Sequence, residues 1–240
     1  MPGNPKGKVV AIIPSAGLGR RMGGRKKNYL LLSGSPVLAY TLAAFESSAL
    51  IDAVIIAVAP GDEGYCRGSL SPFGFQKVSQ IVAGGKERQD SVWNALEFAS
   101  DAEVAVVHDG ARPLVTVEII DAVIRSAFET GAAIAAVPVK DTIKEVSDGM
   151  VARTIDRTRL VSVQTPQAFR REILVNAFRK AKAENFYGTD ESSLVERAVQ
   201  AVSVVSGSYE NFKITTAEDL LFAEGVLGKR GATLSRLPLP

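Results

Sequence analysis

The stretch from Val9 to Lys27 constrains this chain most. It opens with a run of five apolar residues, Val9–Ile13, which is typical of a strand buried on both faces. Glycines at 17, 19, 23 and 24 then allow tight turns and close approach of a ligand, and five cations lie between positions 20 and 27. We interpret the stretch as a strand, a glycine turn and a basic loop that bind phosphate groups. The alternative is an ordinary turn with a solvated basic face.

This loop differs from two common phosphate-binding motifs. The dinucleotide fingerprint G-x-G-x-x-G fails because the third glycine position after Gly17 and Gly19 is Met22. The P-loop fails because Gly24 is followed by Arg-Lys in place of Lys-Ser or Lys-Thr. A dehydrogenase is therefore disfavoured.

Composition limits the remaining classes. The chain has 240 residues, 46% of them hydrophobic, so we expect residues 1–240 to form one domain with a sizeable core. A net charge of +2, with the basic residues clustered in one loop, argues against nucleic-acid binding. One cysteine, Cys66, and one histidine exclude a disulfide framework and a Cys/His metal site. No apolar run has transmembrane or signal-peptide character, so we expect a cytoplasmic protein without membrane contact.

Apolar strands alternate with helical patterns along the chain. Their succession predicts an α/β fold with a doubly wound, mostly parallel sheet. Residues 61–76 are glycine-rich, so we expect a loop there with at most a short helix. We expect strands at 9–13, 53–59, 80–83, 104–107, 132–139 and 201–205, and helices at 36–47, 89–100, 117–130, 171–184, from 190, and from 215 to about 228.

Residues 140–160 break this rhythm. Two alternating segments, 142–146 and 151–155, flank a turn that contains Gly149, which is typical of a β-hairpin. The hairpin is too polar for a core and too short for a domain. We expect an arm that projects from the sheet and contacts a second subunit.

Polar clusters fall at the ends of the predicted strands or on this arm. In an open parallel sheet, ligands bind beyond the carboxyl ends of the strands at the topological switch point. We therefore expect the clusters to contribute to one site. They are residues 15–27, 84–91 and 108–113, with Asp141-Thr142 and Asp156-Arg157 on the arm.

Individual residues in these clusters suggest roles. Gly84 and Gly85 would let a nucleobase lie against the main chain, although an ordinary strand-to-helix turn explains them equally well. Asp109 ends an apolar strand, where a carboxylate must be paired or bind a cation, and we favour Mg²⁺ over pairing with Arg112.

Three other polar residues have simpler interpretations. His108 is a better candidate for orienting its loop by hydrogen bonding than for a general base. Lys213 lies in an apolar run between Phe212 and Ile214, so it needs an anion or a route to solvent. Arg157 is either a solvated charge or a partner of Asp156.

Eight short motifs occur in order along nearly the whole chain and together resemble those of the 2-C-methyl-D-erythritol 4-phosphate cytidylyltransferases of the non-mevalonate isoprenoid pathway. Each motif alone is weak evidence for the family, whereas eight motifs in register are strong evidence. They are Pro14-Ser-Ala-Gly-Leu-Gly-Arg-Arg-Met22, Gly84-Gly-Lys-Glu-Arg88 with Asp90-Ser91-Val92, Val107-His-Asp-Gly-Ala-Arg-Pro113, Val139-Lys-Asp-Thr142, Thr154-Ile-Asp-Arg157, Gln164-Thr-Pro-Gln167, Thr189-Asp-Glu191 and Asn211-Phe-Lys213.

The resemblance implies a Rossmann-like fold of the nucleotide-diphospho-sugar transferase type and a homodimer joined by residues 140–160. It implies transfer of CMP from CTP to methylerythritol phosphate with Mg²⁺, giving the CDP-alcohol and pyrophosphate. Arg20 and Lys27 would be catalytic, and Asp109 would bind the metal. CTP would contact Ser15, Ala16, Gly17, Gly19, Gly84, Gly85, Lys86, Ser91, Gly110 and Lys213, and the sugar phosphate would contact Arg112, Thr142, Thr189 and, from the partner subunit, Arg157.

This chain departs from the family pattern at three places. Ser15 and Gly110 stand where alanine is usual. Lys26-Lys27-Asn28-Tyr29 replaces a customary Pro-Lys-Gln followed by Tyr or Phe. Lys27 takes the family lysine's place by its distance to Tyr29, but losing the proline removes a fixed φ, and Lys26 is the alternative.

The expected chemistry suits these residues. A phosphate monoester has a second pKa of about 6, so the attacking oxygen is already an anion and needs no general base. Two alternatives remain open. One is a sister cytidylyltransferase acting on another polyol phosphate, such as ribitol 5-phosphate, and the other is a non-catalytic nucleotide-binding regulator.

Overall fold

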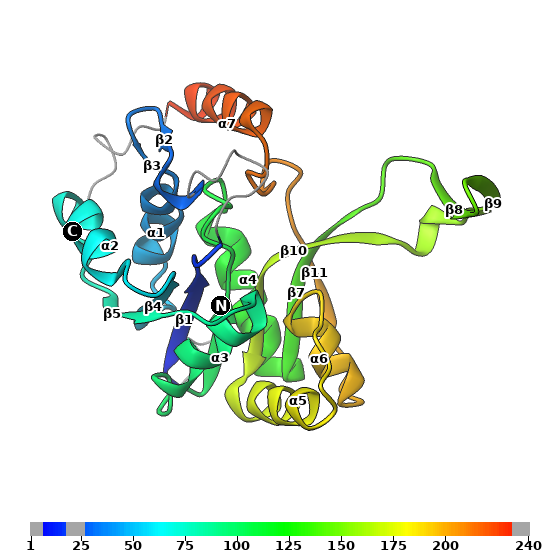
Figure 1. Cartoon of the computed structure of the whole chain (residues 1–240), viewed down its shortest axis with the longest axis horizontal. Helices are drawn as coiled ribbons and strands as arrows, with labels where there is room; N and C mark the ends of the chain where they lie inside the picture. The colour runs from blue at the N-terminus through cyan, green and yellow to red at the C-terminus, as the bar shows by residue number, and fades with distance from the viewer. Residues whose placement is uncertain (1–6, 18–26, 232–240) are drawn as a thin grey trace.

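The structure is a computed structural model that describes residues 7–17 and 27–231, apart from the side chain of Lys27. It contains a large sheet, helices on both its faces and a separate hairpin (Figure 1). The strands are β1 (Val9–Pro14), β2 (Leu31–Leu32), β3 (Ser35–Pro36), β4 (Ala53–Val58), β5 (Val78–Ala83), β6 (Val104–Val107), β7 (Ala132–Pro138), β8 (Ile143–Ser147), β9 (Met150–Ile155), β10 (Val161–Arg170) and β11 (Ser203–Ser206). The α-helices are α1 (Val37–Ser47), α2 (Glu63–Leu70), α3 (Arg88–Glu97), α4 (Val117–Thr130), α5 (Arg171–Ala183), α6 (Glu191–Arg197) and α7 (Ala217–Arg230), with short 3-10 turns at η2 (Lys27–Tyr29), η3 (Ser71–Phe73) and η4 (Arg157–Arg159).

The sheet has seven strands in the order β11-β7-β10-β6-β1-β4-β5. Every neighbouring pair is parallel except the two pairs that involve β10. This confirms the predicted doubly wound, mostly parallel α/β fold. From β1 the chain first builds outward through β4 and β5, then returns to β6 on the other side. The switch point, where ligands bind in such folds, therefore lies between the carboxyl ends of β1 and β6.

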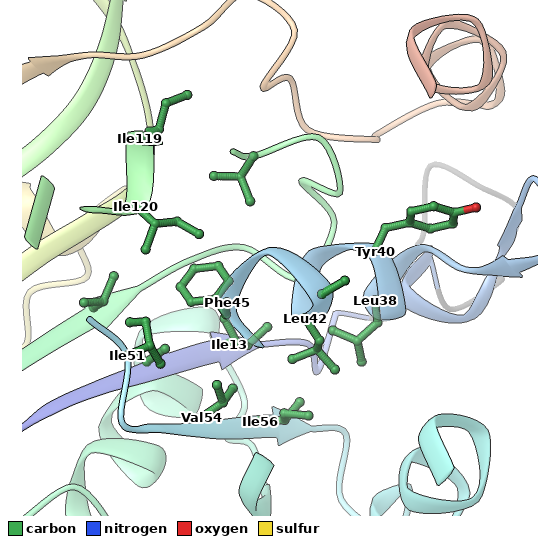
Figure 2. Packing of buried hydrophobic residues seen from close by; sticks show 14 of the residues in the cluster. Ile13, Leu38, Tyr40, Leu42, Phe45, Ile51, Val54, Ile56, Ile119 and Ile120 are labelled. Atoms are coloured by element: carbon green, nitrogen blue, oxygen red, sulfur yellow. The ribbon is translucent and has the colours of Figure 1, made fainter. Parts of the chain in front are cut away.

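Alternation along the strands divides the core between the two faces of the sheet. Val9, Ala11 and Ile13 of β1 point to one face, where they pack with residues of α1 and α4 (Figure 2). Val10 and Ile12 point to the other face, which α3, α5 and α6 cover. Both sets are fully apolar because β1 is buried on both sides, which explains its continuous apolar run.

Strand β10 was not predicted. It runs antiparallel between β6 and β7, in the middle of one half of the sheet. Its sequence contains Pro166, a residue that a central strand excludes unless it sits at an irregularity. The register against β7 shifts between Val163 and Gln167, so the proline falls in that irregularity.

Most other predicted boundaries hold within a few residues, with local corrections. Helix α1 begins at Val37, and Pro36 is its N-cap rather than its first helical residue. Helix α3 begins at Arg88, where Glu87 and Asp90 form a capping box. The apolar run around Lys213 lies in a loop. Helix α4 ends, as predicted, at Gly131 in the left-handed region at φ 89°.

The predicted hairpin is confirmed as the antiparallel pair β8–β9, which projects from the body of the molecule (Figure 1). We call residues 140–160 the arm. Its apolar side chains are unusually exposed, at 59% for Val146, 73% for Met150 and 62% for Val151.

Within the described part of the chain, the helices are all too short or too polar to cross a membrane.

Candidate active site

The carboxyl ends of β1 and β6 are joined by backbone hydrogen bonds. The His108 N–H donates to the carbonyl of Ile12 at 3.0 Å, and the Gly110 N–H donates to that of Pro14 at 3.4 Å. The polar segments that follow both strands therefore lie side by side at the switch point.

Glycines bring the loops after β1, β5 and β6 into close contact. A Cβ at Gly84 would lie 2.8 Å from the Cβ of Ala16 and 2.7 Å from the Ser91 hydroxyl. The Gly85 N–H donates to the same hydroxyl at 3.0 Å. Only glycine at position 84 lets these loops meet. The predicted CTP contacts Ala16, Gly84, Gly85 and Ser91 therefore form one surface, which we call the glycine surface.

Gly110 and Ser15 make a second close contact. A Cβ at Gly110 would lie 2.3 Å from the Ser15 hydroxyl, which is buried and has no hydrogen-bond partner among the described residues. The carbonyl of Ser15 accepts a hydrogen bond from the Asn28 amide at 2.8 Å. The Ser15 hydroxyl thus occupies the space that a methyl group at position 110 would need.

Asp109 follows β6 directly and is almost fully buried among cations. Its carboxylate contacts Arg88 Nε at 3.0 Å, Lys213 Nζ at 2.9 Å and Arg112 Nε at 3.5 Å. Burial alone would raise the pKa of Asp109, but the three cations lower it well below its usual range. Asp109 is therefore an anion at neutral pH, and it is the partner that Lys213 was predicted to need.

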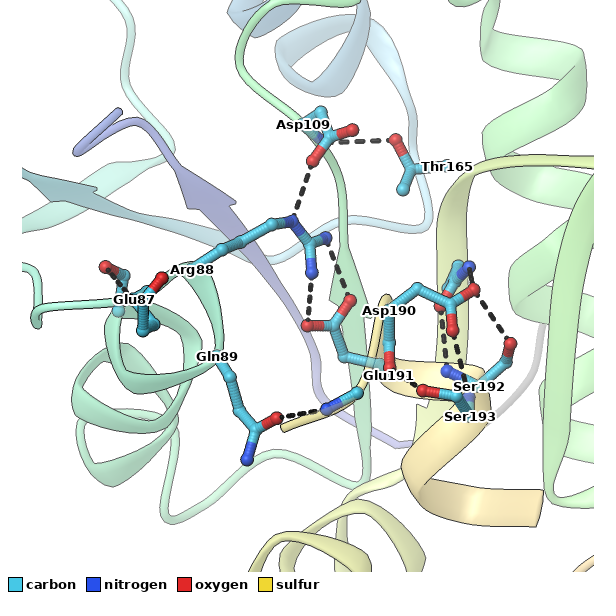
Figure 3. A network of polar contacts seen from close by, with 12 residues as sticks. Glu87, Arg88, Gln89, Asp109, Thr165, Asp190, Glu191, Ser192 and Ser193 are labelled. Atoms are coloured by element: carbon cyan, nitrogen blue, oxygen red, sulfur yellow. Dashed lines mark hydrogen bonds and ion pairs between the residues drawn. The ribbon is translucent and has the colours of Figure 1, made fainter. Parts of the chain in front are cut away.

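Arg88 ties this cluster to helix α6 (Figure 3). Its guanidinium binds both carboxylate oxygens of Glu191, at 2.7 and 2.9 Å, while its Nε binds Asp109. Burial favours the neutral form, but the two carboxylates outweigh it and raise the pKa of Arg88. The fork anchors Arg88 on Glu191, and the Nε–H then holds one oxygen of the Asp109 carboxylate. Sequence reasoning included Arg88 and Glu191 in motifs but gave them no role.

Strand β10 and the loop before α7 complete the cluster. The Asp109 N–H donates to the Thr165 hydroxyl at 3.0 Å. Buried Asn211 donates to the carbonyl of Thr165 at 2.9 Å, and its own carbonyl accepts from Arg112 at 2.8 Å. Thr165 and Asn211 therefore position Asp109 and Arg112, and the motifs in which they lie were the only signal for them.

His108 is fully buried, and its surroundings do not suit a general acid or base. One ring nitrogen, Nε2, lies 3.2 Å from the carbonyl of Arg112. Burial lowers the pKa of His108 to about 3, so the ring is neutral at physiological pH. This confirms that His108 orients its loop by hydrogen bonding.

The other residues predicted for the site are exposed or lie outside the described residues. Gly17 and Lys86 are exposed beside the glycine surface. Thr189 is exposed and precedes Asp190, whose carboxylate accepts the Ser193 N–H at 2.9 Å and caps α6. Thr142 and Arg157 are exposed on the arm, outside the Asp109 cluster, and Arg157 donates to the carbonyl of Lys140. Gly19, Arg20 and the Lys27 side chain lie outside the described residues.

Asp156 does not take Arg157 as its partner. Its carboxylate accepts from the backbone N–H and hydroxyl of Thr158, at 3.0 and 2.8 Å.

The donor set suits a metal held mainly by a substrate. In the described residues no group of three or more acidic, histidine or cysteine side chains is arranged to bind a metal ion. Asp109 offers one carboxylate, whose two oxygens provide about four acceptor positions, three of them used here. One carboxylate combined with substrate phosphates is a common Mg²⁺ environment.

The open sheet, the glycine surface at its switch point and the adjoining cluster of cations define a nucleotidyltransferase fold. The sequence profile of the IspD family, 2-C-methyl-D-erythritol 4-phosphate cytidylyltransferase, matches residues 9–229. The chain belongs to this family.

Individual relatives agree with the family profile. The chain is 49% identical over 232 residues to the 2-C-methyl-D-erythritol 4-phosphate cytidylyltransferase of Pelotomaculum thermopropionicum, covering 95% of this chain and 98% of that protein. It is 48% identical over 217 residues to the Bacillus mycoides protein of the same name, covering 90% and 96%. The crystal structure of 4-diphosphocytidyl-2C-methyl-D-erythritol synthase from Anaerococcus prevotii is similar with a TM-score of 0.82 at 32% identity, over 92% of this chain and 96% of that one.

Proposed function

We propose that this protein transfers CMP from CTP to 2-C-methyl-D-erythritol 4-phosphate in isoprenoid precursor synthesis. The observation that carries the proposal is the Asp109 cluster, which places Arg112 and Lys213 beside the glycine surface at the switch point. Family membership over residues 9–229 supports the choice of substrates.

The reaction is a substitution at the α-phosphorus of CTP. A phosphate oxygen of methylerythritol phosphate forms the new P–O bond, and the bond between the α-phosphorus and the bridging oxygen breaks, releasing pyrophosphate. The attacking group is an anion at neutral pH, since its second pKa is about 6. No side chain must remove a proton, which fits a site whose one histidine is neutral and buried.

The main difficulty is bringing two anions together, and we assign the cations to it. Arg20 and Lys27 stabilise charge at the α-phosphate, and Lys213 and Arg112 face the phosphates of the substrates. Ser15, Ala16, Gly17, Gly19, Gly84, Gly85, Lys86, Ser91 and Gly110 bind the cytidine and triphosphate. Thr189 and Arg112 bind the acceptor.

We assign Mg²⁺ to Asp109 and the phosphates of CTP. When bound, the ion would offset phosphate charge and align the triphosphate. Arg88 would keep the carboxylate oriented toward that position through its Nε bond at 3.0 Å.

We also propose a homodimer in which the arm reaches the partner subunit. The exposed apolar residues of the arm, Val146, Met150 and Val151, need a surface to cover them. In such a dimer Arg157 and Thr142 would bind the sugar phosphate in the partner's site. The cytoplasm is the compartment we propose, because the single cysteine is free and forms no disulfide.

Pyrophosphate release from CTP and Mg²⁺ tests the activity. We expect release with methylerythritol 4-phosphate and none with ribitol 5-phosphate or without acceptor. Release with ribitol 5-phosphate would reassign the enzyme to a sister activity. CTP binding without turnover on either acceptor would indicate a regulator.

Two variants test the assignments of residues. Arg20→Ala should lower turnover by roughly 10²–10³ fold, by analogy with removal of an oxyanion-hole donor; turnover at the wild-type rate would refute its role. Mixing inactive Arg157→Ala and Lys27→Ala proteins should restore activity in mixed dimers if the arm acts in the partner's site. No recovery despite proven subunit exchange would contradict that arrangement.

A further inference from the structure

A cavity lies between α3 and α5. Its volume is about 430 Å³, within the range of small-molecule sites. It is lined by side chains of α3, of α5 and of the segment that leads toward α6. This cavity is separate from the Asp109 cluster, although Lys86, at one rim, also borders the glycine surface.

Four aromatic residues line the cavity, namely Trp93, Phe178, Phe186 and Tyr187. Phe178 is buried, and the Trp93 ring lies 5.7 Å from it, with the planes tilted by 42°. Tyr187 is 59% exposed at the rim. The Arg197 guanidinium lies over the Phe186 ring, 4.5 Å from its centre. These rings offer stacking surfaces to a flat ligand.

Three cations line the cavity together with these rings. Lys86, Arg179 and Lys182 line the cavity and form no ion pair with another described residue. The lining carboxylate, Asp90, already accepts the Glu87 N–H at 3.0 Å as part of the α3 capping box. The lining therefore keeps three cations against one carboxylate, an excess of positive charge, since the hydrogen bond to Asp90 does not cancel its charge.

We propose that this cavity binds a planar aromatic anion, such as an aromatic carboxylate, sulfonate or phosphate. The rings would stack on the ligand, and Arg179 and Lys182 would pair with its anionic group.

Occupancy would also affect the nucleotide site, a part of the proposal that rests on the proposed function. Lys86 is shared between the two sites. Gln89, another lining residue, joins α3 to the chain before α6 by donating to the Phe186 carbonyl at 3.1 Å and accepting the Gly188 N–H at 2.9 Å. An anion in the cavity would draw Lys86 away from CTP and weaken CTP binding.

The binding test uses the chain's single tryptophan, Trp93, as a fluorescence donor. The probe is 8-anilinonaphthalene-1-sulfonate, and N-phenyl-1-naphthylamine is its uncharged counterpart. We expect saturable energy transfer from Trp93 to the sulfonate. Lys182→Glu should weaken the sulfonate about tenfold or more and leave the uncharged probe within about twofold, since it reverses one charge beside the anion.

Lys229→Glu is the control for net charge, because Lys229 is exposed on α7, does not line the cavity and makes the same change in net charge. It should leave sulfonate binding unchanged. Absence of saturable transfer, or equal effects of Lys229→Glu and Lys182→Glu, would overturn the proposed site. Equal loss of both probes in Lys182→Glu would overturn the requirement for charge.

The coupling is tested by the KM for CTP at saturating sulfonate. We expect KM to rise in the wild-type protein and not in Lys182→Glu, whose KM without the probe stays normal. An unchanged wild-type KM would overturn the coupling. The fluorescence result does not depend on turnover, so an inactive protein would contradict the proposed function and leave the binding test decisive.

Discussion

Two arginines in this molecule make ion pairs in opposite surroundings. Arg88 lies between Asp109 and Glu191 at the base of the site, where the Glu191 side chain is 1% exposed. Arg153 pairs with Glu145 across the arm, where the two side chains are 71% and 51% exposed. The interaction type is the same, but water can replace the partner only on the arm.

This difference separates what each pair does. Removing one member of a buried pair leaves an uncompensated charge, whereas an exposed pair contributes little because solvent screens it. The Arg88 pair therefore determines the geometry of the site, whereas the Arg153 pair contributes little to the stability of the hairpin on which it lies. Three changes at buried groups and one at an exposed ion pair test the difference between buried and exposed positions.

Arg88→Ala should have the largest effect. It leaves Asp109 and Glu191 without their shared cation, and we expect a loss of about 3–5 kcal/mol in the free energy of unfolding. Urea unfolding at pH 7 measures it. Arg88→Lys keeps the charge and should lose less, because an ammonium cannot bind Glu191 through a planar fork. A loss below about 1 kcal/mol for Arg88→Ala would show that this pair contributes no more to stability than an exposed ion pair does.

Gly110→Ala should cost about 1–3 kcal/mol, because its methyl group would meet the Ser15 hydroxyl at 2.3 Å. Ser15→Ala removes that hydroxyl and should recover part of the loss in the double variant. A double-mutant cycle in urea measures the coupling. Additive effects would show that Ser15 simply rotates away.

Acid should destabilise the protein through His108. The folded state keeps this ring neutral down to a pKa of about 3, whereas the unfolded chain binds a proton below about 6.5. The unfolded state binds more protons in that window, so the contribution is complete above pH 6.5 and is lost at about 1.4 kcal/mol per unit as the pH falls. Between pH 4 and 6 the wild-type curve should be steeper than that of His108→Gln by this amount. Parallel curves would contradict it.

Arg153→Ala should have the smallest effect, below about 1 kcal/mol, since both side chains of its pair face solvent. The measurement is the urea experiment used for Arg88→Ala, at a protein concentration that keeps the oligomeric state constant. A loss comparable to that of Arg88→Ala would mean that the arm is buried in the assembled protein.

The sequence predicted the parts of the fold that follow from local pattern. Strand β6 and helix α4 have clear apolar runs and a left-handed Gly131 at the helix end, and the arm has alternating segments around Gly149. Strand β10 was missed because Gln164, Pro166 and Gln167 interrupt its apolar pattern, although these residues are buried or at an irregularity of the sheet.

The site was predicted in outline and not in its contacts. Strand ends and glycines indicated where the loops meet, and the isolated Lys213 indicated a missing anion. The link from Arg88 to Glu191 spans 103 residues, and no spacing rule predicts such a contact. Likewise, the relation between Ser15 and Gly110 exists only in three dimensions.

Strand β10 also gives the molecule a mechanical connection. It begins at Val161, at the base of the arm, and passes Thr165, whose hydroxyl accepts the Asp109 N–H. An extended chain covers about 3.3 Å per residue, so about 13 Å of strand separates Val161 from Thr165. A displacement of the arm along β10 would therefore reach the Asp109 backbone through this one strand and the hydrogen bond from the Asp109 N–H to Thr165.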